Sequence, residues 1–151
     1  MSRSGYSEDY DDQWRLICWR GAVTSSIRGK RGQAFLREML AAMDALHEPK
    51  LIESDLERDG LVCAIGSVGR ARGLDMSGID VEDQVSVAGA FGIAQALAAE
   101  IMFLNDDDFC YEARHNASET RQHRFQRMRR WIESQIIEWD TVQHPASTRG
   151  V

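Results

Sequence analysis

The clearest pattern along the chain is an apolar stripe of helical period between residues 35 and 46. Its apolar positions recur at spacings of three and four, whereas Arg37, Glu38 and Asp44 fall elsewhere around the helix. The stripe predicts a helix with one face toward a core, and Pro49 stops it. Its members are Phe35, Leu36, Met39, Leu40, Met43 and Leu46.

A second stripe of this period lies near the C-terminal end. Asn116 and Glu119 have the spacing of a capping box, in which two residues at a helix start satisfy each other's backbone N–H groups. The stripe beyond them predicts a helix that runs to about Asp140. It consists of Phe125, Met128, Ile132, Ile136 and Trp139.

A helix is also predicted to run from Asp11 or Asp12, either of which is a candidate N-cap, to about Ile27. Gly21 in its middle weakens this prediction, and the basic glycine segment 28–32 ends the helix as a turn. Its apolar residues cover two adjoining faces: Trp14, Leu16, Ile17, Cys18, Trp19, Val23 and Ile27.

The stretch from residue 81 to 104 is helical in character as well. Asp80 and the acidic residues after it suit the first turn of a helix, where negative charge is favoured. Gly92 is a candidate break, and the segment 105–108 closes the helix.

Between these helices the period changes to that of strands. Residues 51–52 and 61–65 are apolar and flank a polar stretch that ends in Asp59-Gly60. This dipeptide favours a hairpin turn, because both central residues of the turn need positive φ. We interpret the glycine-rich segment 66–73 as a loop.

These elements predict an α+β fold, mainly α, with about five helical segments around one β-hairpin that turns at Asp59-Gly60. We expect a flexible N-terminus over residues 1–10 and a single helical domain over 11–140, with the hairpin at about 51–66. Residues 141–151 are expected to be a flexible tail.

Composition agrees with one small domain, since the chain has 151 residues and 43% are hydrophobic. The net charge of −6 argues against a generic nucleic-acid binder but leaves room for a local basic face. Three widely spaced cysteines suggest reduced thiols. With no apolar run of about 18 residues and no signal peptide, we expect a cytoplasmic protein without membrane contact.

The segment from Ala88 through Gly92 to Ile101 has the spacing of a helix-turn-helix. Its second helix would be residues 95–104, which contain one Gln, one Glu and no cation. A recognition helix needs Arg, Lys, Asn or Gln for bases and phosphates, so we favour helix packing over DNA reading.

Five arginines gather at the start of the last helix, and they suit phosphate or an acidic protein surface. The alternative, which we favour, is a solvated face paired with the protein's own acids, such as those of residues 106–108. The arginines are Arg121, Arg124, Arg127, Arg129 and Arg130.

Other candidate chemistry is weaker. A metal site is one candidate, because four residues near the C-terminal helix have side chains that bind zinc: Cys110, His115, Glu119 and His123. They lack the closely spaced pairs of known zinc motifs, so we favour the alternative of two surface histidines and a buried thiol. Asp106, Asp107 and Asp108 are consecutive, so their carboxylates point in different directions and suit a helix-ending turn better than a magnesium site. The glycines of residues 66–73 lack the P-loop ending. We expect no catalytic residue, metal or cofactor.

Three stretches together resemble a group of uncharacterised small proteins encoded by temperate phages and prophages. The first joins residues 19–22 to 31–40, the second is 62–73, and the third leads from 91–94 through 100–101 to 105–106. The resemblance spans most of residues 5–140. It implies a phage or prophage origin and brings no activity or site residue with it.

Two functions follow as expectations. The first is a non-enzymatic accessory protein that contacts a host protein, for example to inhibit CRISPR or another defence complex. Trp14 or Trp19 would anchor such a contact, and the acids of 8–12 or 106–108 would compete for a nucleic-acid groove. The alternative is a nucleic-acid-associated factor that uses the arginine helix with Arg28, Lys30 and Arg31; a homo-oligomer is compatible with either.

Overall fold

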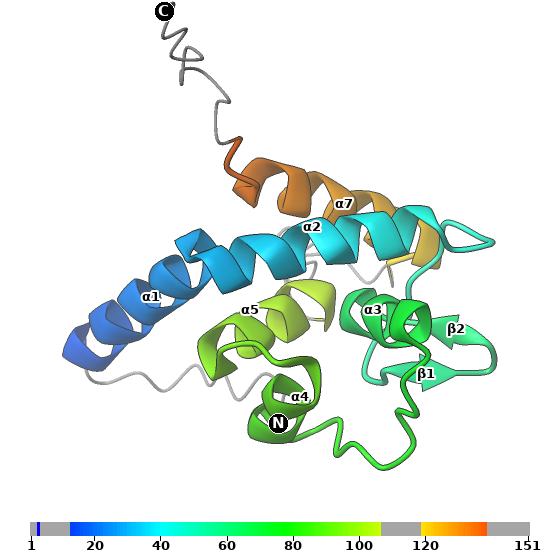
Figure 1. The fold of residues 1–151 in the computed structure, drawn as a ribbon, viewed down its shortest axis with the longest axis horizontal. Helices are drawn as coiled ribbons and strands as arrows, with labels where there is room; N and C mark the ends of the chain where they lie inside the picture. Colours follow the sequence, from blue (N-terminus) through cyan, green and yellow to red (C-terminus); the bar gives the residue numbers. More distant parts are fainter. Residues whose placement is uncertain (1–2, 4–12, 107–118, 139–151) are drawn as a thin grey trace, which may run out of the picture.

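The computed structural model describes residue 3 and residues 13–106 and 119–138, and in these ranges the chain is mainly helical (Figure 1). The α+β prediction is confirmed, with six helices and one two-stranded antiparallel hairpin in the described part. The elements are α1 (Gln13–Arg28), α2 (Lys30–Asp44), β1 (Glu57–Arg58), β2 (Leu61–Val62), α3 (Ala64–Arg72), α4 (Gln84–Phe91), α5 (Gln95–Asp106) and α7 (Arg121–Gln135).

Helix α5 forms the centre of the core. Nearly every residue from Ala96 to Asn105 is buried, because α1, α3, α4 and α7 all pack against it. Alanines at 96, 98 and 99 keep these helices close, and Ile101 and Met102 are fully enclosed. Helix α2 crosses above α5 and runs beside α7 in the opposite direction (Figure 1).

Helix α2 carries the stripe expected at 35–46. Phe35, Leu36, Met39 and Met43 are buried, although the helix ends at Asp44. The turn expected over 28–32 is a single residue, Gly29, because α2 already begins at Lys30. Gly32 permits this sharp junction, since a Cβ there would lie 1.7 Å from the backbone oxygen of Ser26.

The hairpin turn at Asp59-Gly60 is confirmed, with φ values of 54° and 77° at the two residues. The strands are only two residues long, and they pair Glu57 with Val62 and Arg58 with Leu61. Leu51 and Ile52 are not a strand, but the N–H of Ile52 donates to the carbonyl of Val62 at 3.0 Å.

The interpretation of residues 66–73 as a loop is wrong, because they belong to helix α3 and its C-cap. The thiol of Cys63 caps the helix by accepting from the N–H of Gly66 at 3.3 Å. Gly66 and Gly69 allow close packing, and Gly73 ends the helix with a φ of 67°. Two of the glycines that suggested a loop therefore serve close contacts, Gly66 with Leu56 and Gly69 with Met76.

Helices α4 and α5 meet at the break expected at Gly92, whose φ is 70°. No single helix in the described ranges is long and apolar enough to cross a membrane; α4 and α5 meet that criterion only together, across a bend of 110°.

Helix α7 buries Phe125, Met128 and Ile132, as its stripe predicts. Its N-cap is Thr120, whose hydroxyl accepts from the N–H of His123 at 3.1 Å, so the capping box at 116–119 is wrong at least for Glu119. The helix ends at Gln135, before the predicted Asp140. Asn116, Trp139 and the tail 141–151 lie outside the described residues.

Candidate functional site

Arg124, one of the five arginines at the start of the last helix, is buried with 4% of its surface exposed. Its Nε donates to the carbonyl of Asn105 at 2.9 Å, and its Nη1 donates to that of Leu51 at 3.2 Å. Its Nη2 lies 3.2 Å from a carboxylate oxygen of Glu53, and its Nε lies 3.3 Å from one of Glu119. The guanidinium thus joins α7 to the end of α5 and to the segment before the hairpin.

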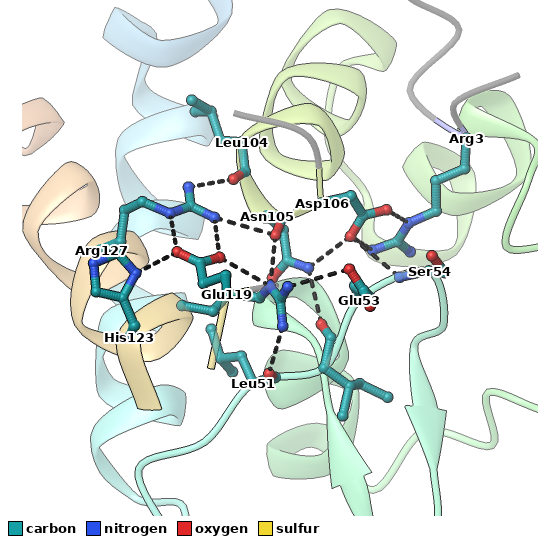
Figure 2. A network of polar contacts seen from close by, with 12 residues as sticks. Arg3, Leu51, Glu53, Ser54, Leu104, Asn105, Asp106, Glu119, His123 and Arg127 are labelled. Carbon is teal, nitrogen blue, oxygen red and sulfur yellow. Dashed lines mark hydrogen bonds and ion pairs between the residues drawn. The ribbon is translucent and has the colours of Figure 1, made fainter. Parts of the chain in front are cut away.

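Arg127 binds Glu119 through two contacts of 2.8 Å (Figure 2). It also donates to the carbonyls of Leu104 and Asn105. These carbonyls belong to the last turn of α5, where a helix leaves C=O groups without partners of its own and carries partial negative charge. Arg124 and Arg127 therefore cap the C-terminus of the central helix.

The carboxylate of Glu119 is enclosed, with 1% of its side chain exposed. Burial acts to raise a carboxyl pKa, but the hydrogen bonds from Arg127 and His123 and the charges of Arg127 and Arg124 outweigh it. The pKa of Glu119 is therefore lowered below its usual value, and the group stays ionised at neutral pH. His123 Nδ1 lies 2.5 Å from its Oε2.

The candidate metal ligands do not assemble in the part of the chain that the structure describes. Glu119 and His123 contact each other, whereas Cys110 and His115 lie outside the described residues. Among the residues that are described, no three His, Cys, Asp or Glu side chains could hold a metal ion. The lone pairs of Glu119 already accept from arginine.

Asp106 ends α5 and pairs with Arg3, not with the arginines of α7 (Figure 2). The contacts measure 2.5 Å to Nε and 3.0 Å to Nη2, and both side chains are almost fully buried. The carboxylate also accepts from the N–H of Ser54 and from the amide of Asn105. Of the N-terminal residues expected to be loose, Arg3 alone is described. Asp107 and Asp108 lie outside the described residues.

The remaining arginines of α7 divide into two groups. Arg129 pairs with Asp44 at 2.8 Å, and the hydrogen bond lowers the pKa of that carboxyl despite some burial. Arg121 and Arg130 are exposed, and neither side chain makes a hydrogen bond or ion pair with a described residue. Arg124, Arg127 and Arg129 thus pair with acids of this chain, and within the described residues these acids are Glu119, Glu53, Asp44 and Glu133, not Asp106.

The burial of α5 favours helix packing over DNA reading by the helix-turn-helix segment. The 110° bend between α4 and α5 is the geometry of that motif. However, α5 lies inside the core and exposes Gln95 alone among residues 95–102. A helix enclosed in this way cannot enter a DNA groove, so its alanines serve packing.

Helix α1 presents an apolar surface that the sequence reasoning did not single out. Leu16 is 40% exposed and Ile17 61%, and the first turns of α1 project beyond the other helices (Figure 1). Trp19, a predicted anchor, is half-buried against the core, and the side chain of Trp14 lies outside the described residues. The sequence did carry a signal for this exposed surface, because apolar residues cover two faces of the helix and packing against a core needs only one.

Three cations gather at the junction of α1 and α2. Arg28, Lys30 and Arg31 are all exposed, and in the described ranges none of them makes an ion pair. They form a small basic surface separate from the buried arginines of α7.

Comparison with protein-family models, with curated proteins and with solved structures gives no match.

Proposed function

We propose that this protein is a small non-enzymatic accessory protein of a temperate phage or prophage that acts by protein–protein contact. Its partner in this proposal is a host protein, such as a component of a CRISPR or other defence complex. The origin and the partner class come from the resemblance and are an analogy. The contact itself is supported by the surface of α1.

The observation that carries the proposal is the exposure of Leu16 and Ile17. Leu16 shares a helix face with Val23 and Ile27, which are buried, so it continues the core-facing stripe past the edge of the body. Ile17 lies on the next face and is more exposed still. Full burial of such a side chain is worth about 1.5–3 kcal/mol, and adjacent exposed apolar residues are typical of a binding surface.

A second candidate function is nucleic-acid association, and the structure changes where it would reside. Arg124 and Arg127 are engaged in capping α5, so the exposed cations that remain include Arg28, Lys30 and Arg31, with Arg15 on α1 and Arg121 and Arg130 on α7. The net charge of −6 argues against it, since a nucleic-acid surface must overcome the repulsion of the other acids.

Phage plating on host strains with active defence systems tests the first proposal. We expect the protein to raise plating efficiency, Ile17→Glu to abolish the effect, and Arg28→Ala/Lys30→Ala/Arg31→Ala to retain it. If Ile17→Glu retains the plating effect and the triple Arg28/Lys30/Arg31 variant loses it, the nucleic-acid function is supported instead. DNA or RNA binding that weakens steeply with salt should then accompany this result. No rescue of plating on a panel of defence systems contradicts the defence-inhibitor role.

A further inference from the structure

We infer that Cys63 is an oxidation site, at which a hydroperoxide adds one oxygen to the sulfur and Arg3 binds the resulting oxyanion. The inference does not depend on the proposed contact of α1, because it concerns a buried group at the start of α3.

A buried nitrogen of Arg3 is the first observation. Arg3 is 6% exposed, and two of its nitrogens, Nε and Nη2, bind the carboxylate of Asp106. The third, Nη1, is buried and has no hydrogen-bond partner among the described residues. A buried charged donor without an acceptor is costly, so Nη1 indicates a ligand or a modified side chain close to Arg3.

The sulfur of Cys63 lies beside this guanidinium. Burial acts to lower the pKa of Arg3, but the Cys63 sulfur and the Asp106 carboxylate outweigh it, so the pKa of Arg3 is raised. Hydrogen bonds bring the two residues together, because Asn105 accepts from the N–H of Ala64 at 3.2 Å and donates to Asp106 at 2.8 Å. One amide thus holds both the first turn of α3 and the partner of Arg3.

The backbone around Cys63 also favours an anion. Cys63 is the N-cap of α3, and its sulfur accepts from the N–H of Gly66 at 3.3 Å. The start of a helix presents N–H groups without partners of their own and carries partial positive charge. The first turn of α3 contains no acidic residue. An anionic oxygen on the sulfur would therefore meet both the backbone donors of α3 and Nη1 of Arg3.

The reaction balances with a hydroperoxide as the oxidant. The sulfur attacks one peroxide oxygen, so that an S–O bond forms and the O–O bond breaks. The sulfur loses two electrons, and the other oxygen leaves with the thiol proton as water or, from an organic peroxide, as an alcohol. The product is a sulfenic acid, which Arg3 binds as its oxyanion after the hydroxyl proton passes to water. Because Cys63 is only 1% exposed, a bulky thiol cannot reach the product to form a disulfide.

Cys63→Asp tests the anion site without any oxidant, because a carboxylate resembles an oxidised sulfur in charge and reach. Cys63→Asn is the matched control, since asparagine caps a helix as well as aspartate does but carries no charge. In thermal unfolding of the full chain we expect Cys63→Asp to have the higher Tm. An Arg3→Lys background, which keeps a cation for Asp106 but lacks Nη1, should reduce this difference. A lower Tm for Cys63→Asp than for Cys63→Asn, or a difference that Arg3→Lys leaves unchanged, overturns the inference.

Treatment of the full chain with dilute hydrogen peroxide tests the reaction itself. Peptide mass mapping should find one added oxygen at Cys63, formed more slowly than at Cys18 because Cys18 is exposed. Cys18 is the internal control and should continue to the products with two and three added oxygens, whereas Cys63 should stop at one. In Arg3→Lys the one-oxygen product at Cys63 should no longer persist. Cys63 that stays unmodified after Cys18 is fully oxidised, or that gains three oxygens as Cys18 does, overturns the inference.

Discussion

Arg124→Met removes the charge at the centre of the α5–α7 network and keeps an unbranched side chain in the same space. The change withdraws donors from the carbonyls of Leu51 and Asn105, and it removes one cation from Glu119. Breaking a buried ion pair costs about 3–5 kcal/mol, and here the carbonyl of Leu51 loses its arginine donor while Glu119 and Asn105 keep Arg127. That is a large part of the roughly 5–15 kcal/mol that stabilises a typical domain.

Urea unfolding followed by far-UV circular dichroism measures this loss, with thermal unfolding as a second readout. For a chain of this size we expect Tm to fall by about 6–20 °C. Arg121→Met is the matched control, since Arg121 lies one turn earlier on α7 and its side chain is exposed without a hydrogen bond or ion pair to a described residue. Its free energy of unfolding should change by less than about 0.5 kcal/mol.

Equal urea midpoints for Arg124→Met and Arg121→Met would refute the capping role of Arg124. The arginines of α7 would then again be candidates for a binding surface. If the difference is as large as expected, any loss of binding in an Arg124 variant reports unfolding and carries no information about a nucleic-acid site.

Three further predictions concern the same framework. The pKa of Glu119 is lower in the folded than in the unfolded chain, so the ionised carboxylate stabilises the fold above the unfolded pKa of about 4.3, and this contribution is lost as pH falls through the folded pKa. Glu119→Gln should therefore lower the free energy of unfolding at pH 7 and flatten the acid side of a stability–pH profile. Gly66→Ala should destabilise strongly in thermal unfolding, because its Cβ would lie 2.0 Å from a backbone oxygen, whereas Gly89→Ala should stabilise by about 0.5–1 kcal/mol. Arg3→Ala should cost about 3–5 kcal/mol in urea unfolding by leaving the buried Asp106 without its cation, and no change in midpoint would contradict this pairing.

Much of the fold follows from local patterns in the sequence. The apolar stripes of α2 and α7, the turn at Asp59-Gly60 and the break at Gly92 each depend on residues within a few positions. Helix α3 was missed because its glycines resemble a loop locally. Their role depends on Leu56 and Met76, whose approach only the folded chain defines.

The candidate site was less predictable for the same reason. The periodicity of α7 showed that its arginines share faces, but the carbonyls that Arg124 binds lie 19 and 73 positions away in the sequence. The pairing of Asp106 with Arg3 joins residues 103 positions apart. The two apolar faces of α1 indicated that some apolar residues would stay uncovered, but which of them are exposed depends on where the body beneath α1 ends.

Amide hydrogen exchange along α1 tests the central claim most directly, because any protein that docks on this helix must slow exchange there. We predict that amides in the first half of α1, around Leu16 and Ile17, gain protection when host proteins are added to the chain. The Ile17→Glu variant should show no such gain. Exchange in α1 that added host proteins leave unchanged, while another surface such as α4 becomes protected, would contradict the account.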